Sequence, residues 1–198
     1  MLRSYQTADL LTLANGAAGT AAILTMMSYL RSPEDWRVVL SLSLILLALL
    51  FDVADGKVAR RQHQNSVFGQ ELDSLADIVS FGVAPAVLAY GLGMHGAFDA
   101  TILIFFVSCG ISRLARYNVT ASDLADSGGK VRYFEGTPIP SSVILVALLA
   151  GCFYLDRIGD HLPLGVIEIA SLHWHPLSLV FFVNGSTMIS KTLKIPKL

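Results

Sequence analysis

The fold of this chain depends on how it accommodates residues 51–80, FDVADGKVARRQHQNSVFGQELDSLADIVS. This stretch places four aspartates, Asp52, Asp55, Asp73 and Asp77, between long apolar runs. An ionised carboxylate in apolar surroundings is costly unless a cation or hydrogen bonds compensate it. The stretch therefore predicts that folding, or a bound partner, brings compensating groups to these four acids.

The composition around this stretch is that of a membrane protein. Of the 198 residues, 54% are hydrophobic and only 15% are charged, and the mean hydropathy is +0.60, which lies outside the usual range of soluble globular proteins. Residues 38–51 contain no charge and, with their helical flanks, approach the roughly 20 residues that cross a bilayer core. The net charge of −1 gives no reason to expect a nucleic-acid partner.

Six apolar segments can be traced along the chain. They cover residues 9–30, 33–60, 70–92, 98–117, 138–156 and 176–192. We expect an all-α integral membrane protein with six transmembrane helices, in which residues 1–198 form a single domain. The second segment has a plausible start in which Ser32 caps the helix and Pro33 occupies its first turn.

The distribution of Lys and Arg predicts the orientation. With a cytoplasmic N-terminus, that side receives eleven of the fourteen: Arg3, Lys57, Arg60, Arg61, Arg113, Arg116, Lys130, Arg132, Lys191, Lys194 and Lys197. The opposite side holds Arg31, Arg37 and Arg157. Both termini, and the end of the second helix that carries the acids, are therefore predicted to be cytoplasmic. Residues 157–175 are expected to lie at the opposite membrane interface, with His173 and His175 flanking Trp174 as an interfacial anchor.

The spacing of the aspartates predicts that they converge. Asp52 and Asp55 are three residues apart and Asp73 and Asp77 are four apart, so each pair shares one face of a helix. A turn that folds the third helix against the second brings all four carboxylates together. Such a group repels itself unless cations neutralise it, and two divalent cations about 4 Å apart suit oxygen ligands of this kind.

The neighbours of the acids suit a phosphate. Gly56 and Gly69 remove side chains next to the acids and give a phosphate or nucleotide access to the backbone, while Lys57, Arg60 and Arg61 supply positive charge. Two other classes of protein remain open at this point. The acids can serve as a cation or proton relay in a transporter, or as structural partners in a membrane scaffold without catalytic activity.

The pattern Asp52-x2-Asp55-Gly56-x2-Ala59-Arg60-x8-Gly69-x3-Asp73-x3-Asp77 resembles the complete signature of the CDP-alcohol phosphotransferases. The resemblance implies a six-helix membrane enzyme, usually a homodimer. Such enzymes move a phosphoryl-linked group from a CDP-activated donor to an alcohol and release CMP. It further implies two divalent cations, Mg²⁺ or Mn²⁺, as cofactors.

The resemblance also implies roles for particular residues. Asp52, Asp55 and Asp73 are expected to bind metal, and Asp77 is expected to be the general base with some contact to the second metal. Seven residues are expected to hold the CDP moiety: Asn15, Asp55, Gly56, Ala59, Arg60, Gly69 and Asp73. An alternative for Asn15, which lies among Gly16 and Gly19, is close helix packing.

Other stretches resemble the phosphatidylserine synthase branch of the family. They are Thr12-Leu-Ala-Asn15, residues 72–86, Ser112-Arg-Leu-Ala-Arg-Tyr-Asn118 and residues 133–140. This resemblance implies L-serine as acceptor and CDP-diacylglycerol as donor; another alcohol or an ether-lipid donor remains an alternative. It places the enzyme in the endoplasmic reticulum of a eukaryote or the cell membrane of a prokaryote.

The zwitterionic acceptor needs an anchor for its carboxylate. Arg113 and Arg116, at the cytoplasmic end of the fourth helix, are candidates for that anchor. Their alternative role is an ordinary positive flank of a membrane helix. Asn118 and Glu135 are candidates for binding the ammonium group or for ordering the loop that follows.

Overall fold

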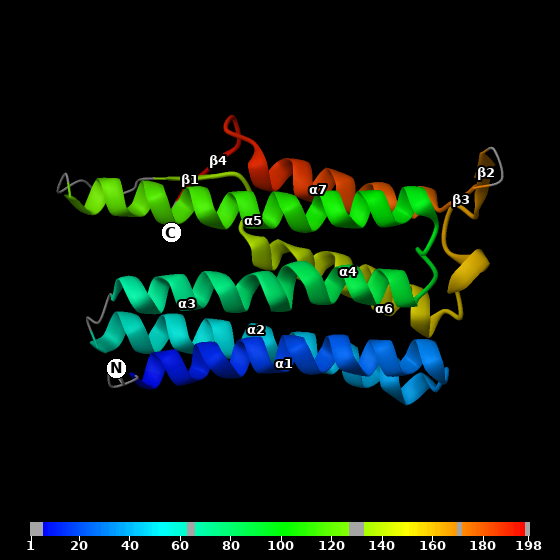
Figure 1. The fold of residues 1–198 in the computed structure, drawn as a ribbon, viewed down its shortest axis with the longest axis horizontal. Helices are drawn as coiled ribbons and strands as arrows, with labels where there is room; N and C mark the ends of the chain where they lie inside the picture. The colour runs from blue at the N-terminus through cyan, green and yellow to red at the C-terminus, as the bar shows by residue number, and fades with distance from the viewer. Residues whose placement is uncertain (1–5, 63–65, 127–132, 170–171, 197–198) are drawn as a thin grey trace.

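The computed structural model describes residues 6–62, 66–126, 133–169 and 172–196, and it shows an elongated bundle of helices that run along its long axis (Figure 1). The first half contains α1 (Thr7–Arg31), α2 (Asp35–Gln62), α3 (Val67–Asp77), the π-helix η1 (Ile78–Val83), α4 (Ala84–Gly91) and α5 (Ala97–Asp126). The second half contains β1 (Tyr133–Glu135), η2 (Ile139–Ser142), α6 (Val143–Tyr154), η3 (Gly159–His161), β2 (Ile167–Ile169), β3 (Leu172–Trp174), η4 (Pro176–Ser178), α7 (Leu179–Ile189) and β4 (Lys194–Pro196).

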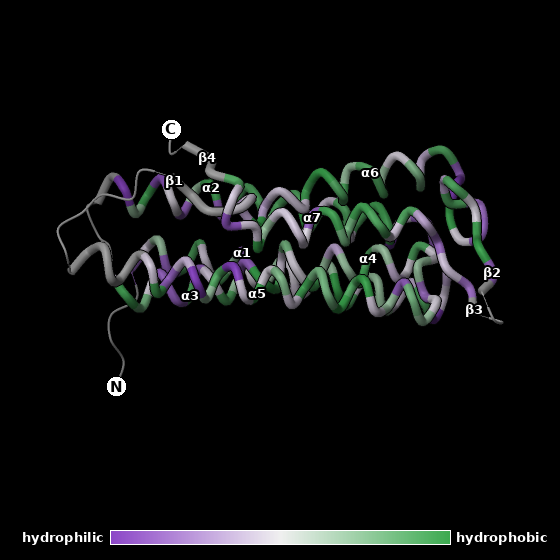
Figure 2. The backbone as a smooth tube through the Cα atoms, turned by 90° about the horizontal axis from the view of Figure 1, so that it is seen from above, coloured by the Kyte–Doolittle hydropathy of each residue, from purple (hydrophilic) through white to green (hydrophobic). Residues whose placement is uncertain are grey.

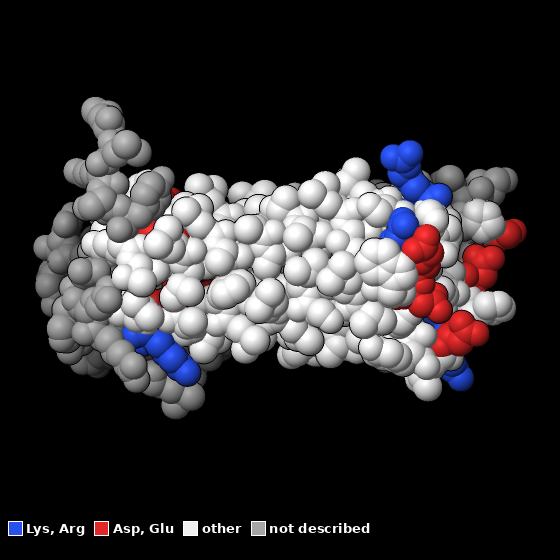
Figure 3. All heavy atoms as spheres, turned by 90° about the horizontal axis from the view of Figure 1, so that it is seen from below, with Lys and Arg blue, Asp and Glu red and all other residues white. Residues whose placement is uncertain are grey.

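The described helices have the lengths and composition of a membrane protein. Four are long and apolar enough to cross a bilayer, namely Thr7–Arg31, Asp35–Arg60, Val67–Gly91 and Ala97–Thr120. Two apolar helices are shorter, Ile139–Tyr154 and Pro176–Ile189. On the face shown in Figure 3, charged side chains gather toward the two ends and the middle is without them. The prediction of an all-α membrane protein is confirmed at this level.

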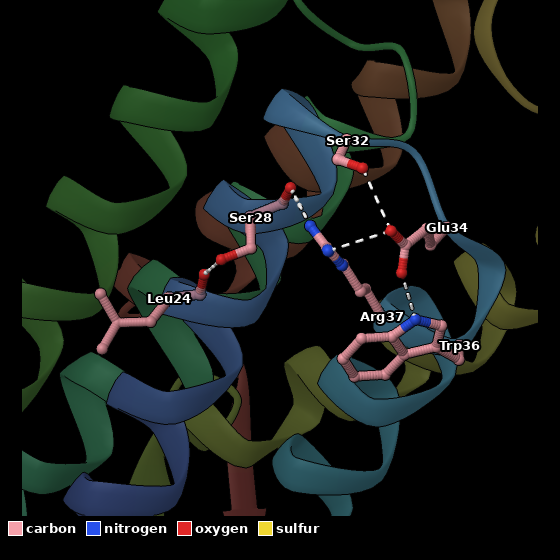
Figure 4. Close-up of polar contacts among 6 residues, drawn as sticks. All are labelled: Leu24, Ser28, Ser32, Glu34, Trp36 and Arg37. Atoms are coloured by element: carbon pink, nitrogen blue, oxygen red, sulfur yellow. Dashed lines mark hydrogen bonds and ion pairs between the residues drawn. The ribbon is translucent and has the colours of Figure 1, made fainter.

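The turn between α1 and α2 differs from the prediction. Ser32 ends α1, because its backbone N–H donates to Ser28 O, and α2 begins only at Asp35. The expected capping of the second helix by Ser32 is therefore wrong. Figure 4 shows what closes the turn instead: Glu34 accepts hydrogen bonds from Ser32, Trp36 and Arg37, and Arg37 also donates to Ser28 O.

Helix α1 packs very closely on the helix formed by α3, η1 and α4. A Cβ added at Gly19 would lie 2.7 Å from Ser80 Cα, so only glycine allows this approach. A Cβ added at Gly16 would meet Ala76 Cβ at 3.5 Å, which is ordinary contact. In Figure 2 hydrophilic segments gather toward the ends of the bundle, and α1 and α3 contact each other. Polar side chains of α1 are thereby brought to the helix that carries Asp73 and Asp77.

The third predicted segment, residues 70–92, is one continuous helix with a π-helical stretch in its middle. Pro85 lacks a backbone N–H and so cannot donate to a carbonyl one turn before it. The N–H of Ala84 donates to Val79 O, five residues back. This wider turn begins directly after Asp77 and buries Ser80, and π-helical turns of this kind are frequent at functional sites.

A buried acid fastens the opposite end of the bundle. Asp99, in the first turn of α5, accepts from the backbone N–H groups of His175 and Gly96, and its Oδ2 lies 2.7 Å from His175 Nδ1. The side chains of His175 and Asp99 are only 2% and 0% exposed. The expected anchoring role at the membrane surface is therefore wrong for His175. This histidine follows the antiparallel β2–β3 hairpin and joins it to α5.

Candidate metal and substrate site

Three of the four motif aspartates converge as predicted. Asp52 and Asp55 lie near the end of α2 and Asp73 lies on α3, and one carboxylate oxygen of each falls within 4.8 Å of the others. Asp77 is one turn beyond Asp73 and only 7% exposed, and the other three aspartates are its neighbouring like charges. The acids of α2 and α3 therefore lie together at one end of the bundle, the left end in Figure 1.

The carboxylates of this cluster are not paired with cationic side chains: among the described residues, no Lys, Arg or His forms an ion pair with any of the four aspartates. Asp73 Oδ1 is buried and has no hydrogen-bond partner. Closely spaced carboxylates without a cation repel one another, and oxygen-rich sites of this kind suit Mg²⁺ or Mn²⁺. The side chains present therefore fit a divalent cation.

Helix α1 supplies neutral hydrogen-bond donors to two of the acids. Thr12 Oγ1 lies 2.8 Å from Asp55 Oδ2, and Asn15 Nδ2 donates to Asp77 Oδ1 at 3.1 Å. The sequence predicted a nucleotide contact for Asn15, with close helix packing as the alternative, and no role for Thr12. A signal was present, because Thr12 and Asn15 are polar residues three positions apart on the same face of a largely apolar helix.

The glycines and the arginine of the motif lie beside the cluster. Gly56 is next to the exposed Arg60, whose Nη1 would be 3.6 Å from a Cβ at position 56. Ala59 is on the same turn and half-buried. Gly69 lies in the first turn of α3, and its N–H donates to Ser66 Oγ. A Cβ at position 69 would lie 3.1 Å from Asp9 Oδ1. A side chain at position 69 would therefore crowd Asp9, whereas a Cβ at position 56 would make only ordinary contact with Arg60.

The arginines predicted to bind serine occupy two different environments. Arg113 is only 9% exposed, its Nε has no hydrogen-bond partner, and the negative charge of Asp77 acts on it. Its guanidinium lies 5.9 Å from the Tyr117 ring centroid. Arg116 instead donates to the carbonyls of Met188 and Ile189 at the end of α7. Only Arg113 therefore faces the acid cluster with donors left for a ligand.

The two other predicted acceptor residues lie farther along the chain. Asn118 Oδ1 accepts from Ser74 Oγ at 3.2 Å, which ties α5 to the turn between Asp73 and Asp77. The backbone of Glu135 belongs to β1 and pairs with Lys194 of β4. The side chains of Glu135 and Arg61 lie outside the part of the chain whose side chains are described.

Comparison with known proteins places these residues in a family context. A family model described as CDP-alcohol phosphatidyltransferase matches residues 5–183. A CDP-diacylglycerol–serine O-phosphatidyltransferase of Saccharomyces cerevisiae is 46% identical, over 100% of this chain and 72% of the relative. An archaetidylserine synthase of Methanothermobacter thermautotrophicus is 37% identical over 82% of this chain and 63% of its own length. A CDP-diacylglycerol–serine O-phosphatidyltransferase of Helicobacter pylori is 36% identical over 70% and 55%.

Proposed function

The chain belongs to the CDP-alcohol phosphatidyltransferase family, and on this premise we propose that it transfers the phosphatidyl group of CDP-diacylglycerol to the hydroxyl of L-serine, releasing CMP. The observation that carries the proposal is the convergence of Asp52, Asp55 and Asp73, which form no ion pair with any described side chain, at one end of an apolar bundle. The choice of donor and acceptor is supported by the names of relatives that are 46% and 36% identical.

The acid cluster holds two divalent cations, Mg²⁺ or Mn²⁺, in this proposal. Asp52, Asp55 and Asp73 are the ligands, and Asp77 contributes to the second ion. When bound, the cations would neutralise the negative charge that develops on the departing CMP. The buried, unpartnered Oδ1 of Asp73 supports this role, because a buried carboxylate oxygen normally has a partner.

Asp77 is the general base of the proposed reaction. Its carboxylate takes the proton of the serine hydroxyl while the serine oxygen forms a bond to the lipid-linked phosphorus. The bond between that phosphorus and the oxygen of CMP breaks, and the electron pair leaves with CMP. Burial of Asp77 supports the assignment, because it keeps bulk water away from the reacting oxygen.

Donor and acceptor approach the cluster from different elements. The CDP moiety lies along α2 and the start of α3, against Gly56, Ala59, Arg60 and Gly69. The acyl chains of the donor remain in the lipid beside the apolar surface. The serine carboxylate binds Arg113, whose buried guanidinium has an unused donor and whose charge lies near Asp77. Three further residues, Arg116, Asn118 and Glu135, complete the proposed binding site for serine.

The membrane arrangement remains part of the proposal. The two shorter helices, Ile139–Tyr154 and Pro176–Ile189, complete six crossings. The excess of Lys and Arg predicted on the side of the acid cluster supports a cytoplasmic location for both termini and for the active site. The membrane is the endoplasmic reticulum in a eukaryote or the cell membrane in a prokaryote. A homodimer is the expected assembly.

Reconstitution tests this function directly. Purified protein in lipid nanodiscs, given CDP-diacylglycerol, L-serine and Mn²⁺, should release CMP and form phosphatidylserine that mass spectrometry detects. Parallel reactions with inositol or glycerol phosphate should release no CMP above background. A reaction with an ether-linked donor tests the activity that the name of the archaeal relative implies. Release of CMP with another alcohol but not with serine would refute the acceptor.

A further inference from the structure

Helix α1 presents two hydrogen-bond donors to the acid cluster from a single face. Thr12 and Asn15 are three residues apart and therefore neighbours on the helix surface. Each engages one oxygen of a different carboxylate, Thr12 that of Asp55 and Asn15 that of Asp77. A hydrogen bond to one oxygen restricts rotation of a carboxylate about its Cβ–Cγ bond. The two contacts thus restrict the orientation of an acid on α2 and an acid on α3.

The position of these donors is itself fixed by tight packing. Ser80 Oγ donates to the backbone carbonyl of Asn15 at 3.0 Å, which ties α1 to the π-helical turn after Asp77. Gly19 brings the two helices so close that an added Cβ would collide with the backbone of Ser80. Helix α1 therefore cannot slide or rotate against Asp77 without breaking these contacts.

Hydrogen bonding within α1 alone does not explain the polar side chains on this face. Asn15 is 0% exposed, and its Oδ1 has no partner. A buried amide with one end unsatisfied is costly in an apolar helix bundle. Thr20 and Thr25 of the same helix bond to carbonyls of their own helix. Thr12, in contrast, also reaches a carboxylate on α2.

We propose that Thr12 and Asn15 are positioning residues of the active site: Thr12 orients Asp55 for metal binding, and Asn15 orients Asp77 for proton transfer. The proposal rests on the proposed function, because the roles of Asp55 and Asp77 belong to it. It assigns Asn15 to the base and not to the nucleotide. Loss of Thr12 should therefore weaken metal binding, whereas loss of Asn15 should slow turnover without weakening donor binding.

The Thr12 contact can be tested without substrate. The probe is Mn²⁺ alone, titrated into the purified full-length chain and followed by electron paramagnetic resonance. Thr12→Val should weaken Mn²⁺ binding about tenfold, and Thr12→Ser should restore it to nearly the wild-type value. Thr20→Val is the matched control, because the Thr20 hydroxyl contacts only Gly16 O, and it should bind as wild type does. Equal affinities of Thr12→Val and Thr20→Val would overturn this assignment.

The Asn15 contact is tested by separating kcat from KM. Asn15→Ala should lower kcat about tenfold to a hundredfold while the KM for CDP-diacylglycerol stays unchanged. Asn15→Asp should be at least as severe, because it places a second carboxylate against Asp77. A raised KM for the donor with unchanged kcat would show a nucleotide contact and overturn the assignment. If wild type releases no CMP with serine, the proposed function fails, and the Mn²⁺ titration still decides whether Thr12 positions Asp55.

Discussion

Buried aspartates lie at both ends of this bundle, and their surroundings differ. Asp99 at the start of α5 receives two backbone N–H groups and the imidazole of His175, so both of its oxygens are hydrogen-bonded from within the chain. At the opposite end, Asp73 has a buried oxygen without a hydrogen-bond partner, and among the described side chains no ion pair compensates the acids around it. Both carboxylate oxygens of Asp99 are hydrogen-bonded within the chain, whereas Asp73 has an oxygen that remains available to a cation.

This difference separates a structural acid from functional ones. A buried carboxylate with all its hydrogen bonds holds two elements together, and its loss leaves donors unsatisfied. Carboxylates that repel one another destabilise the fold in the absence of a cation and so indicate a binding site. Substitutions at the two ends should therefore have opposite effects on activity and on stability.

The largest expected effect is on activity at the cluster. Asp77→Asn should lower CMP release about a thousandfold, because the amide cannot accept the serine proton. Thermal unfolding in detergent should shift little, because the amide oxygen can still accept from Asn15 and one like charge is removed. A variant that keeps wild-type turnover would show that Asp77 is not the base.

The next largest effect is on stability at the far end. Asp99→Asn should lower the free energy of unfolding by about 2–3 kcal/mol, because an amide cannot satisfy all three donors that face Asp99. Chemical denaturation in micelles measures the change, and turnover per folded molecule should stay near that of wild type. His173→Ala is the control, since His173 is exposed and its only ion-pair contact is with exposed Glu168. Equal free energies of unfolding for the two variants would show that Asp99 has no structural role.

An intermediate effect is expected at Arg113, the buried cation that faces the cluster. Arg113→Lys should raise the KM for serine about tenfold and leave the KM for CDP-diacylglycerol unchanged, because lysine loses the paired contact with a carboxylate. Arg116→Lys should change the KM for serine less, because Arg116 already contacts the end of α7. If steady-state kinetics show a larger rise in the KM for serine with Arg116→Lys than with Arg113→Lys, Arg116 is the residue that binds the serine carboxylate.

The smallest effect is expected at an exposed acid near the far end. Hydrogen bonds from Trp36 and Ser32, and the charge of Arg37, lower the pKa of Glu34 below its ordinary value of 4.5. Its ionised form therefore contributes stability above pH 4.5 and loses that contribution as the pH falls through the lowered pKa. Glu34→Gln should unfold at a slightly lower temperature than wild type at neutral pH and at the same temperature in acid. A difference in unfolding temperature between Glu34→Gln and wild type that grows in acid would contradict this prediction.

The sequence predicted the acid cluster because helical spacing alone puts each pair of aspartates on one face. It did not predict the donors of α1, because the contact from Thr12 to Asp55 joins residues 43 positions apart. The partnership of Asp99 and His175 spans 76 positions and was missed for the same reason. The π-helical turn after Asp77 follows from Pro85, a local signal that hydropathy patterns do not register.

The most direct test of the account is a titration of the purified chain with Mn²⁺, followed by electron paramagnetic resonance and by thermal unfolding. Wild type and Asp99→Asn should both bind two ions and be stabilised by them, by about 2.7 kcal/mol for each ion at a hundred times its Kd. An Asp52→Asn, Asp73→Asn double variant should neither bind nor be stabilised. Absence of binding in wild type, or binding that survives in the double variant, would contradict the claim that the cluster is completed by metal.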